Sequence, residues 1–369
     1  MHSRSHGLHC VLPPMVLENI ARKGNEEQRE WATRALSQDH SIRLARVQNS
    51  LAGVATSSQR ADALVGVAAP RPARVISDAH GTEDVRGPIV RREADAATDD
   101  TATNEAYDGL GDTFDFWLSV YGRNSIDDAG MPLRGVVHFG ERYPNAFWDG
   151  QRMVFGDGDG DVLGLMTSSL DVIGHELGHG VTEREAGLEY FGQSGAMNES
   201  LSDAWGSLVK QYKNHQDAAS ADWLIGSDVW TPSIAGDALR SMKAPGTAYD
   251  DPLVGKDSQP AHMDNYVETI QDNGGVHINS GIPNRAFYLA ATEIGGFAWE
   301  VTGRIWYEAL RDPGLRPDSG FAAFARLTVV AAERLQGQGS PAATAVKDAW
   351  ESVGVPTEQP ALQSFTARG

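Results

Sequence analysis

The sequence has 369 residues, of which 41% are hydrophobic and 22% charged, and its formal net charge is -19. A chain of this length can bury a sizeable core and form two lobes. The negative charge argues against nucleic acid and anionic membrane surfaces as partners, so we expect a soluble protein that binds neither. Cys10 is the single cysteine, which excludes an internal disulfide and a cysteine-rich zinc site.

The N-terminal part of the chain differs in character from the rest. The apolar patch at residues 11–17 is too short for a signal peptide and is interrupted by two prolines. No later run approaches the roughly 20 apolar residues of a membrane span. We therefore expect synthesis in the cytoplasm, with any secretion by a route other than Sec. Residues 18–51 predict one or two short amphipathic helices. Residues 53–72, rich in Ala, Gly, Ser and Pro, predict an exposed connector.

A mixed α/β region follows and is succeeded by a mainly helical one. Strands around a turn are predicted at 74–81 and 87–91, a helix at 105–121, and further strands at 135–139 and 153–155. Apolar spacing with Gly or Pro punctuation then predicts helices at 201–212, 283–294, 297–310, 321–336 and 341–353. The predicted fold class is therefore α+β.

The most informative segment is residues 175–179, with the sequence His-Glu-Leu-Gly-His. Residues four apart on a helix share a face, with Cβ atoms about 5–6 Å apart, so His175 and His179 can bind one zinc ion. Glu176 then lies beside the metal, where it can act as general base toward a zinc-activated water. If it is helical, the motif forms half of a hydrolytic zinc site.

A catalytic zinc ion usually takes three protein ligands and keeps a fourth position for water. A metzincin would need Gly and His where Thr182 and Glu185 stand, so that class is excluded. The favoured third ligand is Glu199, at the start of a predicted helix. Asn198 and Asp203 flank it and can accept hydrogen bonds from the outer imidazole nitrogens, which would orient the ligating rings. Helix capping and surface solvation are the alternative roles for these two residues.

Five motifs resemble those of the thermolysin-like zinc metalloproteases, in the order that the family has them. They are Asn145-Ala-Phe-Trp-Asp149, His175-Glu-Leu-Gly-His-Gly-Val-Thr, Ala186-Gly-Leu-Glu-Tyr190, Gly195-Ala-Met-Asn-Glu-Ser-Leu-Ser-Asp203 and Gly274-Gly-Val-His-Ile-Asn-Ser-Gly281. The resemblance covers residues 73–355. It implies a bilobal fold, with a mixed β/α N-terminal lobe, a mainly helical C-terminal lobe and an active-site cleft between them. It also implies one catalytic Zn2+ bound by His175, His179 and Glu199.

The resemblance further assigns the chemical roles. Glu176 is the general base, because a carboxylate beside an activated water can take its proton and pass it to the leaving amine. His277 and the Tyr190 hydroxyl are the donors toward the oxyanion, and Asp272 orients His277. Without the resemblance, His277 and Tyr190 would be interpreted as structural residues.

Substrate binding is also implied by the resemblance. Asn145 and Ala146 match the edge segment that pairs with an extended peptide, and Arg240 matches the arginine that binds a substrate carbonyl. The pocket for the residue after the scissile bond is lined by Met166, Val172, Ile225, Val229 and Leu239. We therefore expect a preference for a large apolar residue there. A surface salt bridge for Arg240 and ordinary core packing for the pocket residues are the alternatives.

The chain departs from thermolysin itself at the calcium site. Asp171 and Asp222 match ligand positions, but Lys210, Leu224 and Ser227 stand where three further acidic ligands would be. A cation that needs about six to eight oxygen ligands cannot be held this way. We therefore predict that the Lys210 ammonium replaces calcium and pairs with Asp171 or Asp222.

The segment from His9 to Leu17 resembles the short propeptide of the protealysin-like subgroup, whose Pro-Pro-x-x-Leu-like element lies in the substrate cleft. Pro13, Pro14 and Leu17 are the matching residues. A rigid Pro-Pro pair followed by apolar side chains loses little entropy on docking. A disordered tail is the alternative for this segment, and a Cys10 thiolate bound to zinc is a further hypothesis.

The sequence thus predicts the zymogen of a neutral zinc endopeptidase that cleaves peptides and proteins, acts as a monomer and holds its own propeptide in its cleft. The expected parts are an inhibitory propeptide at 1–52, a linker with the maturation site at 53–73, lobes at 74–190 and 191–355, and a tail at 356–369. A zinc aminopeptidase and a catalytically silent peptide-binding protein are the alternatives. An aminopeptidase would need a carboxylate motif that binds the free amine of its substrate, and the sequence shows none. A catalytically silent protein would be expected to have lost Glu176 or His277, and both are present.

Overall fold

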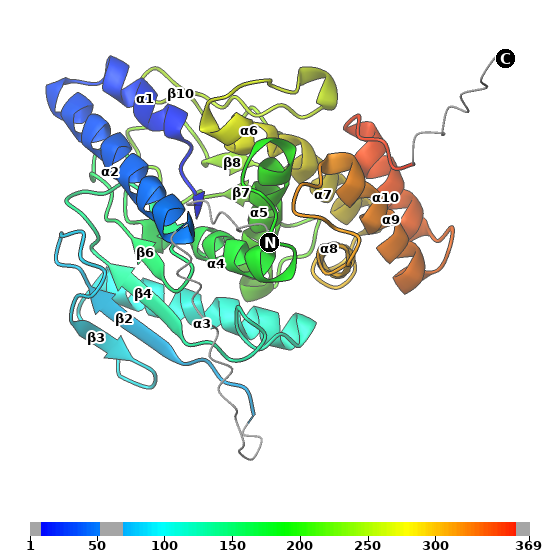
Figure 1. The fold of residues 1–369 in the computed structure, drawn as a ribbon, viewed down its shortest axis with the longest axis horizontal. Helices are drawn as coiled ribbons and strands as arrows, with labels where there is room; N and C mark the ends of the chain where they lie inside the picture. Colours follow the sequence, from blue (N-terminus) through cyan, green and yellow to red (C-terminus); the bar gives the residue numbers. More distant parts are fainter. Residues whose placement is uncertain (1–8, 52–68, 359–369) are drawn as a thin grey trace.

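The computed structural model describes residues 9–51 and 69–358, whose arrangement Figure 1 shows. Most of the predicted linker at 53–73 and of the tail at 356–369 lies outside these residues. A mixed sheet with helices comes first along the main part of the chain, and a mainly helical region follows, which confirms the predicted α+β fold. Within the described ranges, no helix is long and apolar enough to cross a bilayer.

A six-stranded mixed sheet organises the first region, in the order β1-β5-β6-β4-β2-β3. The strands are β1 (His9–Cys10), β2 (Arg74–Asp78), β3 (Ile89–Arg92), β4 (Leu133–Val137), β5 (Ala146–Trp148) and β6 (Met153–Phe155). The three central strands β2, β4 and β6 are parallel, whereas β3, β5 and β1 run antiparallel to their neighbours. The N-terminal strand β1, which was not predicted, therefore extends the sheet at its β5 edge.

Three long helices connect the sheet to the rest of the molecule. They are α3 (Thr101–Tyr121), α4 (Leu170–Glu185), which follows the short helix η1 (Met166–Ser168), and α5 (Gly192–Asn214). Helices α4 and α5 approach closely because glycines lie between them. A Cβ atom on Gly206 would lie 2.2 Å from the Asp171 carbonyl oxygen, and one on Gly174 would lie 3.0 Å from the Gly206 Cα atom. This close packing brings side chains of the two helices to one place.

Helices dominate the second region, and α5 contacts four of them. The helices are α6 (Asp272–Asn279), α7 (Gly281–Ile294), α8 (Thr302–Leu310), α9 (Phe321–Gln336) and α10 (Pro341–Ser352). Two small sheets and one short helix lie in the connections, comprising β7 (Leu224–Ile225) with β8 (Arg240–Ser241), β9 (Asp250–Asp251) with β10 (Gly255–Lys256), and η2 (Met263–Asn265).

After the linker, three predicted helix starts were wrong by four residues or more. Helix α3 begins at Thr101 rather than at residue 105, because Asp100 caps it by accepting the Thr103 N–H at 2.6 Å. Helix α5 begins at Gly192, so Glu199 lies inside the helix and not at its start. The polar and small residues before position 201 hid this part of α5, because they are buried by tertiary packing and show no apolar spacing. Helix α8 begins at Thr302 rather than at residue 297, since residues 297–301 form a turn in which the Ala298 carbonyl accepts the Gly303 N–H at 2.8 Å.

The N-terminal segment continues from β1 into α1 (Pro14–Lys23) and α2 (Glu26–Leu51), drawn in blue in Figure 1. Pro14 opens α1, where its missing N–H needs no partner. Leu17 is fully buried in the main hydrophobic core, and Trp31 of α2 donates a hydrogen bond to the Arg142 carbonyl at 2.7 Å. The alternative of a disordered tail is therefore wrong for the described part of this segment.

Candidate active site

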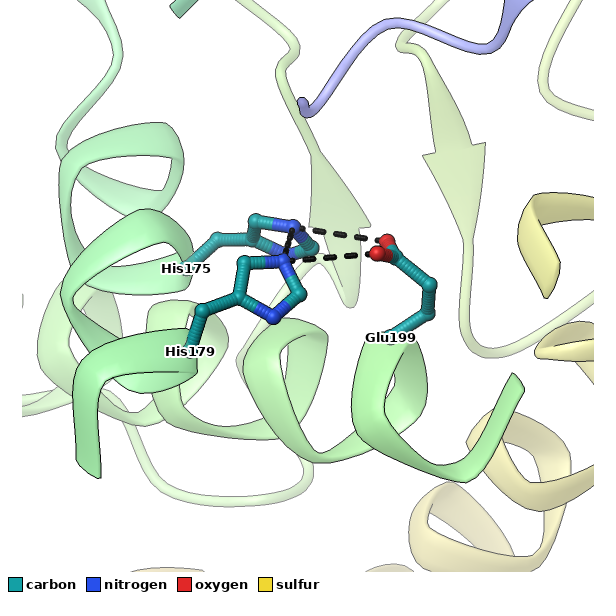
Figure 2. Close-up of side chains that lie close together, drawn as sticks. All are labelled: His175, His179 and Glu199. Carbon is teal, nitrogen blue, oxygen red and sulfur yellow. Dashed lines mark hydrogen bonds and ion pairs between the residues drawn. The ribbon is translucent and has the colours of Figure 1, made fainter. Parts of the chain in front are cut away.

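Three ligand atoms converge where α4 packs on α5. His175 and His179 project from α4 and Glu199 projects from α5, and all three are fully buried (Figure 2). The two Nε2 atoms are 3.0 Å apart, and the Glu199 oxygens lie 3.5 Å and 3.3 Å from His175 Nε2 and His179 Nε2. Among the described residues, these three form the one group of His, Cys, Asp or Glu side chains that could hold a metal ion, and their ligand atoms all lie within 4.8 Å of one another.

The outer ring nitrogens are oriented by residues of α5. His175 Nδ1 lies 2.8 Å from Asp203 Oδ1, and His179 Nδ1 lies 2.8 Å from Asn198 Oδ1. Because those oxygens accept, each Nδ1 carries the proton and each Nε2 presents a lone pair to the other and to Glu199. Facing lone pairs beside a buried carboxylate repel unless a cation lies between them. Two imidazoles and a carboxylate are a common ligand set of catalytic zinc, so these residues fit one zinc ion.

Glu176 lies beside this ligand group and is fully buried. Its Oε2 accepts the backbone N–H of Trp148 in β5 at 3.1 Å. The carboxylate is therefore held between helix α4 and strand β5. A carboxylate in this position can accept a proton from a water molecule at the ligand group.

His277 follows a tight turn in α6, in which Gly274 and Gly275 have φ angles of 82° and 76°. The turn brings Asp272 back, so that its carboxylate accepts the His277 N–H at 2.8 Å and lies 2.6 Å from Nδ1. Burial alone would lower the pKa of His277, but the charges of Asp272 and Glu199 raise it to about 9. A cation bound by Glu199 would reduce the second of these contributions.

Tyr190 lies just before α5 and is buried. Its hydroxyl donates a hydrogen bond to Glu199 Oε1 and is 3.4 Å from His277 Nε2. The predicted donors Tyr190 and His277 therefore lie on the same side of Glu199. In this structure the tyrosine hydroxyl contacts the carboxylate directly.

Arg240 in β8 is buried, so its interpretation as a surface salt bridge was wrong. Its Nε and Nη2 atoms donate to Asp203 at 2.8 and 2.7 Å, and Asn284 donates to the same carboxylate at 2.8 Å. Burial alone would raise the pKa of Asp203, but the Arg240 charge and the hydrogen bond with His175 hold it well below its usual range. Asp203 thus links the predicted zinc ligand His175 to Arg240.

The backbone of the N-terminal segment crosses this site. Strand β1 pairs antiparallel with β5, with Cys10 opposite Phe147. The Cys10 carbonyl oxygen accepts a hydrogen bond from His277 Nε2 at 2.8 Å. The Cys10 side chain packs in a small hydrophobic cluster with Val136 and Phe147, and the ligand group contains no cysteine. The hypothesis that Cys10 binds zinc is therefore wrong in this structure.

The next two residues contact the predicted substrate-binding groups. Arg240 Nη1 donates to the Val11 carbonyl oxygen at 2.6 Å, and the Leu12 N–H donates to Asn145 Oδ1 at 3.2 Å. Asn145 precedes β5, which begins at Ala146. The residues predicted to hold a substrate backbone thus hold the backbone of the N-terminal segment.

The predicted pocket residues are buried in the main hydrophobic cluster. They are Met166, Val172, Ile225, Val229 and Leu239. Val11, Leu12 and Leu17 belong to the same cluster, while Pro13 is buried and Pro14 half-buried. The apolar side chains of the N-terminal segment and the predicted pocket therefore form one continuous core.

Lys210 pairs with both predicted carboxylates. Its Nζ atom lies 2.7 Å from Asp171 Oδ2 and 3.1 Å from Asp222 Oδ2, and it donates to the Leu224 carbonyl at 2.9 Å. The ammonium thus occupies the centre of this oxygen cluster. Burial alone would lower the pKa of Lys210, but the two carboxylates raise it above its usual value.

Sequence reasoning missed three polar residues of the site. Ser202 Oγ lies 2.9 Å from His179 Nδ1, Gln259 Nε2 donates to the His277 carbonyl at 2.8 Å, and the Asp39 carboxylate accepts from the Tyr143 hydroxyl next to Asn145. Ser202 could have been found, since it lies one turn after Glu199. Gln259 and Asp39 lie in distant segments, and no local pattern marks them.

Comparisons with known proteins agree with this geometry. Residues 59–183 match the family model described as thermolysin metallopeptidase, catalytic domain, and residues 186–355 match that described as thermolysin metallopeptidase, alpha-helical domain. The chain is 47% identical to an extracellular metalloprotease of Pectobacterium carotovorum subsp. carotovorum, over 96% of this chain and 99% of that protein. It is 43% identical to protease PrtS of Photorhabdus sp. (strain Az29), over 97% and 95%.

A solved structure extends the similarity to the N-terminal segment. The precursor of protealysin, a metalloproteinase from Serratia proteamaculans, superposes with a TM-score of 0.84 and is 49% identical. The match covers 94% of this chain and 99% of that chain.

Proposed function

We infer that His175, His179 and Glu199 hold a catalytic zinc ion and that Glu176 is the general base. The chain belongs to the thermolysin family of metallopeptidases. The chain is a metalloendopeptidase of this family. The observation that carries the assignment of roles is the convergence of two imidazole lone pairs and a carboxylate beside a second buried carboxylate.

The side chains around the ligand group would divide the work of amide hydrolysis. Zinc bound there supplies a Lewis acid, which acidifies water and polarises a carbonyl. Glu176 takes a proton from the attacking water and passes it to the leaving nitrogen. His277, held by Asp272, donates a hydrogen bond to the oxygen of the tetrahedral intermediate. The Tyr190 hydroxyl turns from Glu199 toward the same oxygen.

Substrate would bind as an added strand on β5. Ala146 and Asn145 would pair with its backbone, and Arg240 would bind the carbonyl of the residue after the scissile bond. This proposal is supported by the contacts that the same groups make with Val11 and Leu12. The substrate side chain that follows the scissile bond would enter the apolar pocket lined by Met166, Val172, Ile225, Val229 and Leu239.

Specificity can be measured with a pair of internally quenched peptides that differ only after the scissile bond. We expect the matured protein to cleave the peptide with Leu there about 100-fold more efficiently than the peptide with Asp, because burying Leu gains about 1.5–3 kcal/mol and burying a carboxylate costs free energy. Leu239→Ala should lower kcat/KM for the Leu peptide about tenfold. Leu335→Ala, at a Leu that is 38% exposed, is the matched control. Equal rates for both peptides would contradict the proposed preference.

Metal content tests the ligand assignment and the calcium proposal together. We propose that the Lys210 ammonium replaces calcium, because its charge lies where a cation would have to bind. After dialysis against buffer that contains zinc and calcium, mass spectrometry of the metals should find one zinc per chain and no calcium attributable to the Lys210 site. Glu199→Gln should lose zinc, whereas Glu189→Gln, at an exposed residue, should retain it. Tight stoichiometric calcium at this site would refute the role of Lys210.

The N-terminal segment is proposed to inhibit the enzyme until it is removed. Pro13, Pro14 and Leu17 would direct it into the site, and the similarity to a metalloproteinase precursor supports this role. We further propose that the protein acts outside the cell as a monomer and uses neither nucleic acid nor membrane as partner. Its similarity to a protein named as an extracellular metalloprotease supports the first of these points.

A further inference from the structure

The N-terminal segment enters the site as strand β1 and bends at Val11 and Leu12, and three of its backbone groups are paired in chain order. The Cys10 carbonyl contacts His277, the Val11 carbonyl contacts Arg240, and the Leu12 N–H contacts Asn145. Three successive residues thus meet three of the groups proposed to bind a substrate.

The order of these contacts identifies one peptide bond. His277 Nε2 is 2.8 Å from the Cys10 oxygen and 3.6 Å from Glu199 Oε2, so the Cys10 carbonyl is the one beside the ligand group. The Val11 carbonyl, one residue further, is already bound by Arg240. The amide between Cys10 and Val11 therefore lies where the scissile bond of a substrate would lie.

We propose that the Cys10–Val11 peptide bond is a self-cleavage site of the precursor, separate from the maturation site expected at 53–73. The inference rests on the proposed function, because it uses the same base and the same donors. The side chains agree with it. The residue after the bond, Val11, is apolar, as the proposed specificity requires. It is fully buried and belongs to the core cluster that contains Leu239.

The reaction is a hydrolysis and needs only water. Water adds to the Cys10 carbonyl carbon while Glu176 accepts its proton, and His277 donates a hydrogen bond to the oxyanion. Glu176 then gives the proton to the Val11 nitrogen as the carbon–nitrogen bond breaks. The second proton of the added water passes from the new carboxyl group to the Val11 amine, so the products are a carboxylate on Cys10, in the peptide of residues 1–10, and an ammonium group on Val11.

The cut would not free the site, because the chain after Val11 is anchored independently. Arg240 and Asn145 retain Val11 and Leu12, Leu17 stays buried in the core, and Trp31 of α2 keeps its hydrogen bond to the body of the protein. The nicked precursor should therefore stay inhibited. Its activation would still require removal of the segment that begins at Val11.

The test follows the full-length chain, purified and supplied with zinc, by intact-mass measurement and N-terminal sequencing over time. We expect a species that begins at Val11, together with a peptide that ends at Cys10, at a rate independent of protein concentration. Glu176→Gln should yield neither. Val11→Asp should slow the cut at least tenfold, and Val11→Leu should preserve it. After maturation, both Val11 variants should hydrolyse casein as the parent does, since the residue has been removed.

The outcomes separate this inference from the proposed function. A precursor that never yields a chain beginning at Val11, yet matures into an enzyme that hydrolyses casein, would overturn the inference alone. A species beginning at Val11 in the Glu176→Gln protein, or one formed faster at higher protein concentration, would also overturn it, because another molecule would have made the cut. Absence of both casein hydrolysis and self-cleavage would refute the proposed function as well.

Discussion

Glu176→Gln should lower casein hydrolysis by at least about 10³-fold and leave zinc content unchanged, since positioned general bases contribute about 10²–10⁴-fold. Glutamine has the same shape and can still accept the Trp148 N–H that Glu176 accepts at 3.1 Å. It cannot take a proton from water at neutral pH. The substitution therefore removes the chemistry and leaves the three metal ligands in place. Casein hydrolysis and zinc content should be measured on the same preparation.

The comparison must remove the N-terminal segment from both proteins, because a variant that cannot process itself would stay inhibited. Trypsin, which cleaves after arginines such as Arg60, can do this and can then be blocked by a serine-protease inhibitor that leaves zinc untouched. Glu183→Gln, two turns further along α4, is the matched control and should keep its activity. Loss of zinc together with activity would make Glu176 structural, and retention of a tenth of the activity would exclude it as the base.

Lys210→Met should destabilise the folded protein by about 3 kcal/mol, near the lower end for breaking a buried ion pair. Asp171 is fully buried, and the Lys210 side chain is only 9% exposed. Removing the ammonium leaves the Asp171 charge without its cation, although Ser169 and the Gly226 N–H still donate to that carboxylate. Urea unfolding should show the loss, measured in the Glu176→Gln background so that self-digestion does not interfere.

Two matched variants identify the cause of that loss. Asp222→Asn removes the other carboxylate, whose side chain is 43% exposed, and should cost less than about 1 kcal/mol. Adding Asp171→Asn to Lys210→Met should recover part of the stability, because it removes the buried charge that the first change exposed. A double variant less stable than Lys210→Met alone would show that packing, and not charge, sets the cost.

Local patterns were sufficient for much of the fold and for half of the metal site. The spacing of His175 and His179 predicts their common face, since a helix places residues four apart on one side. Helices α9 and α10 were predicted almost to the residue by apolar spacing that ends in Gly or begins at Pro. Helix α5 was predicted too short, because its first turns are buried among polar partners and carry no apolar period.

The resemblance to a family supplied residues that no local pattern marks. His277 and Arg240 lie on segments far from α4, and Tyr190 lies in the connection between α4 and α5. Each by itself has the features of an ordinary structural residue. Their roles remain proposals, but the structure brings all three to the ligand group.

The sequence by itself determined the zinc-binding motif, the fold class and the family, because these depend on short spacings along one chain. The tertiary structure alone decided that Asp203 joins His175 to Arg240, that Lys210 contacts both carboxylates, and that the Cys10 and Val11 carbonyls contact His277 and Arg240. The Cys10 carbonyl meets a residue 267 positions away, and Val11 meets one 229 positions away. The packing of β1 and α1 against the folded core sets which residues of the N-terminal segment meet His277 and Arg240. No local periodicity of the sequence encodes that alignment.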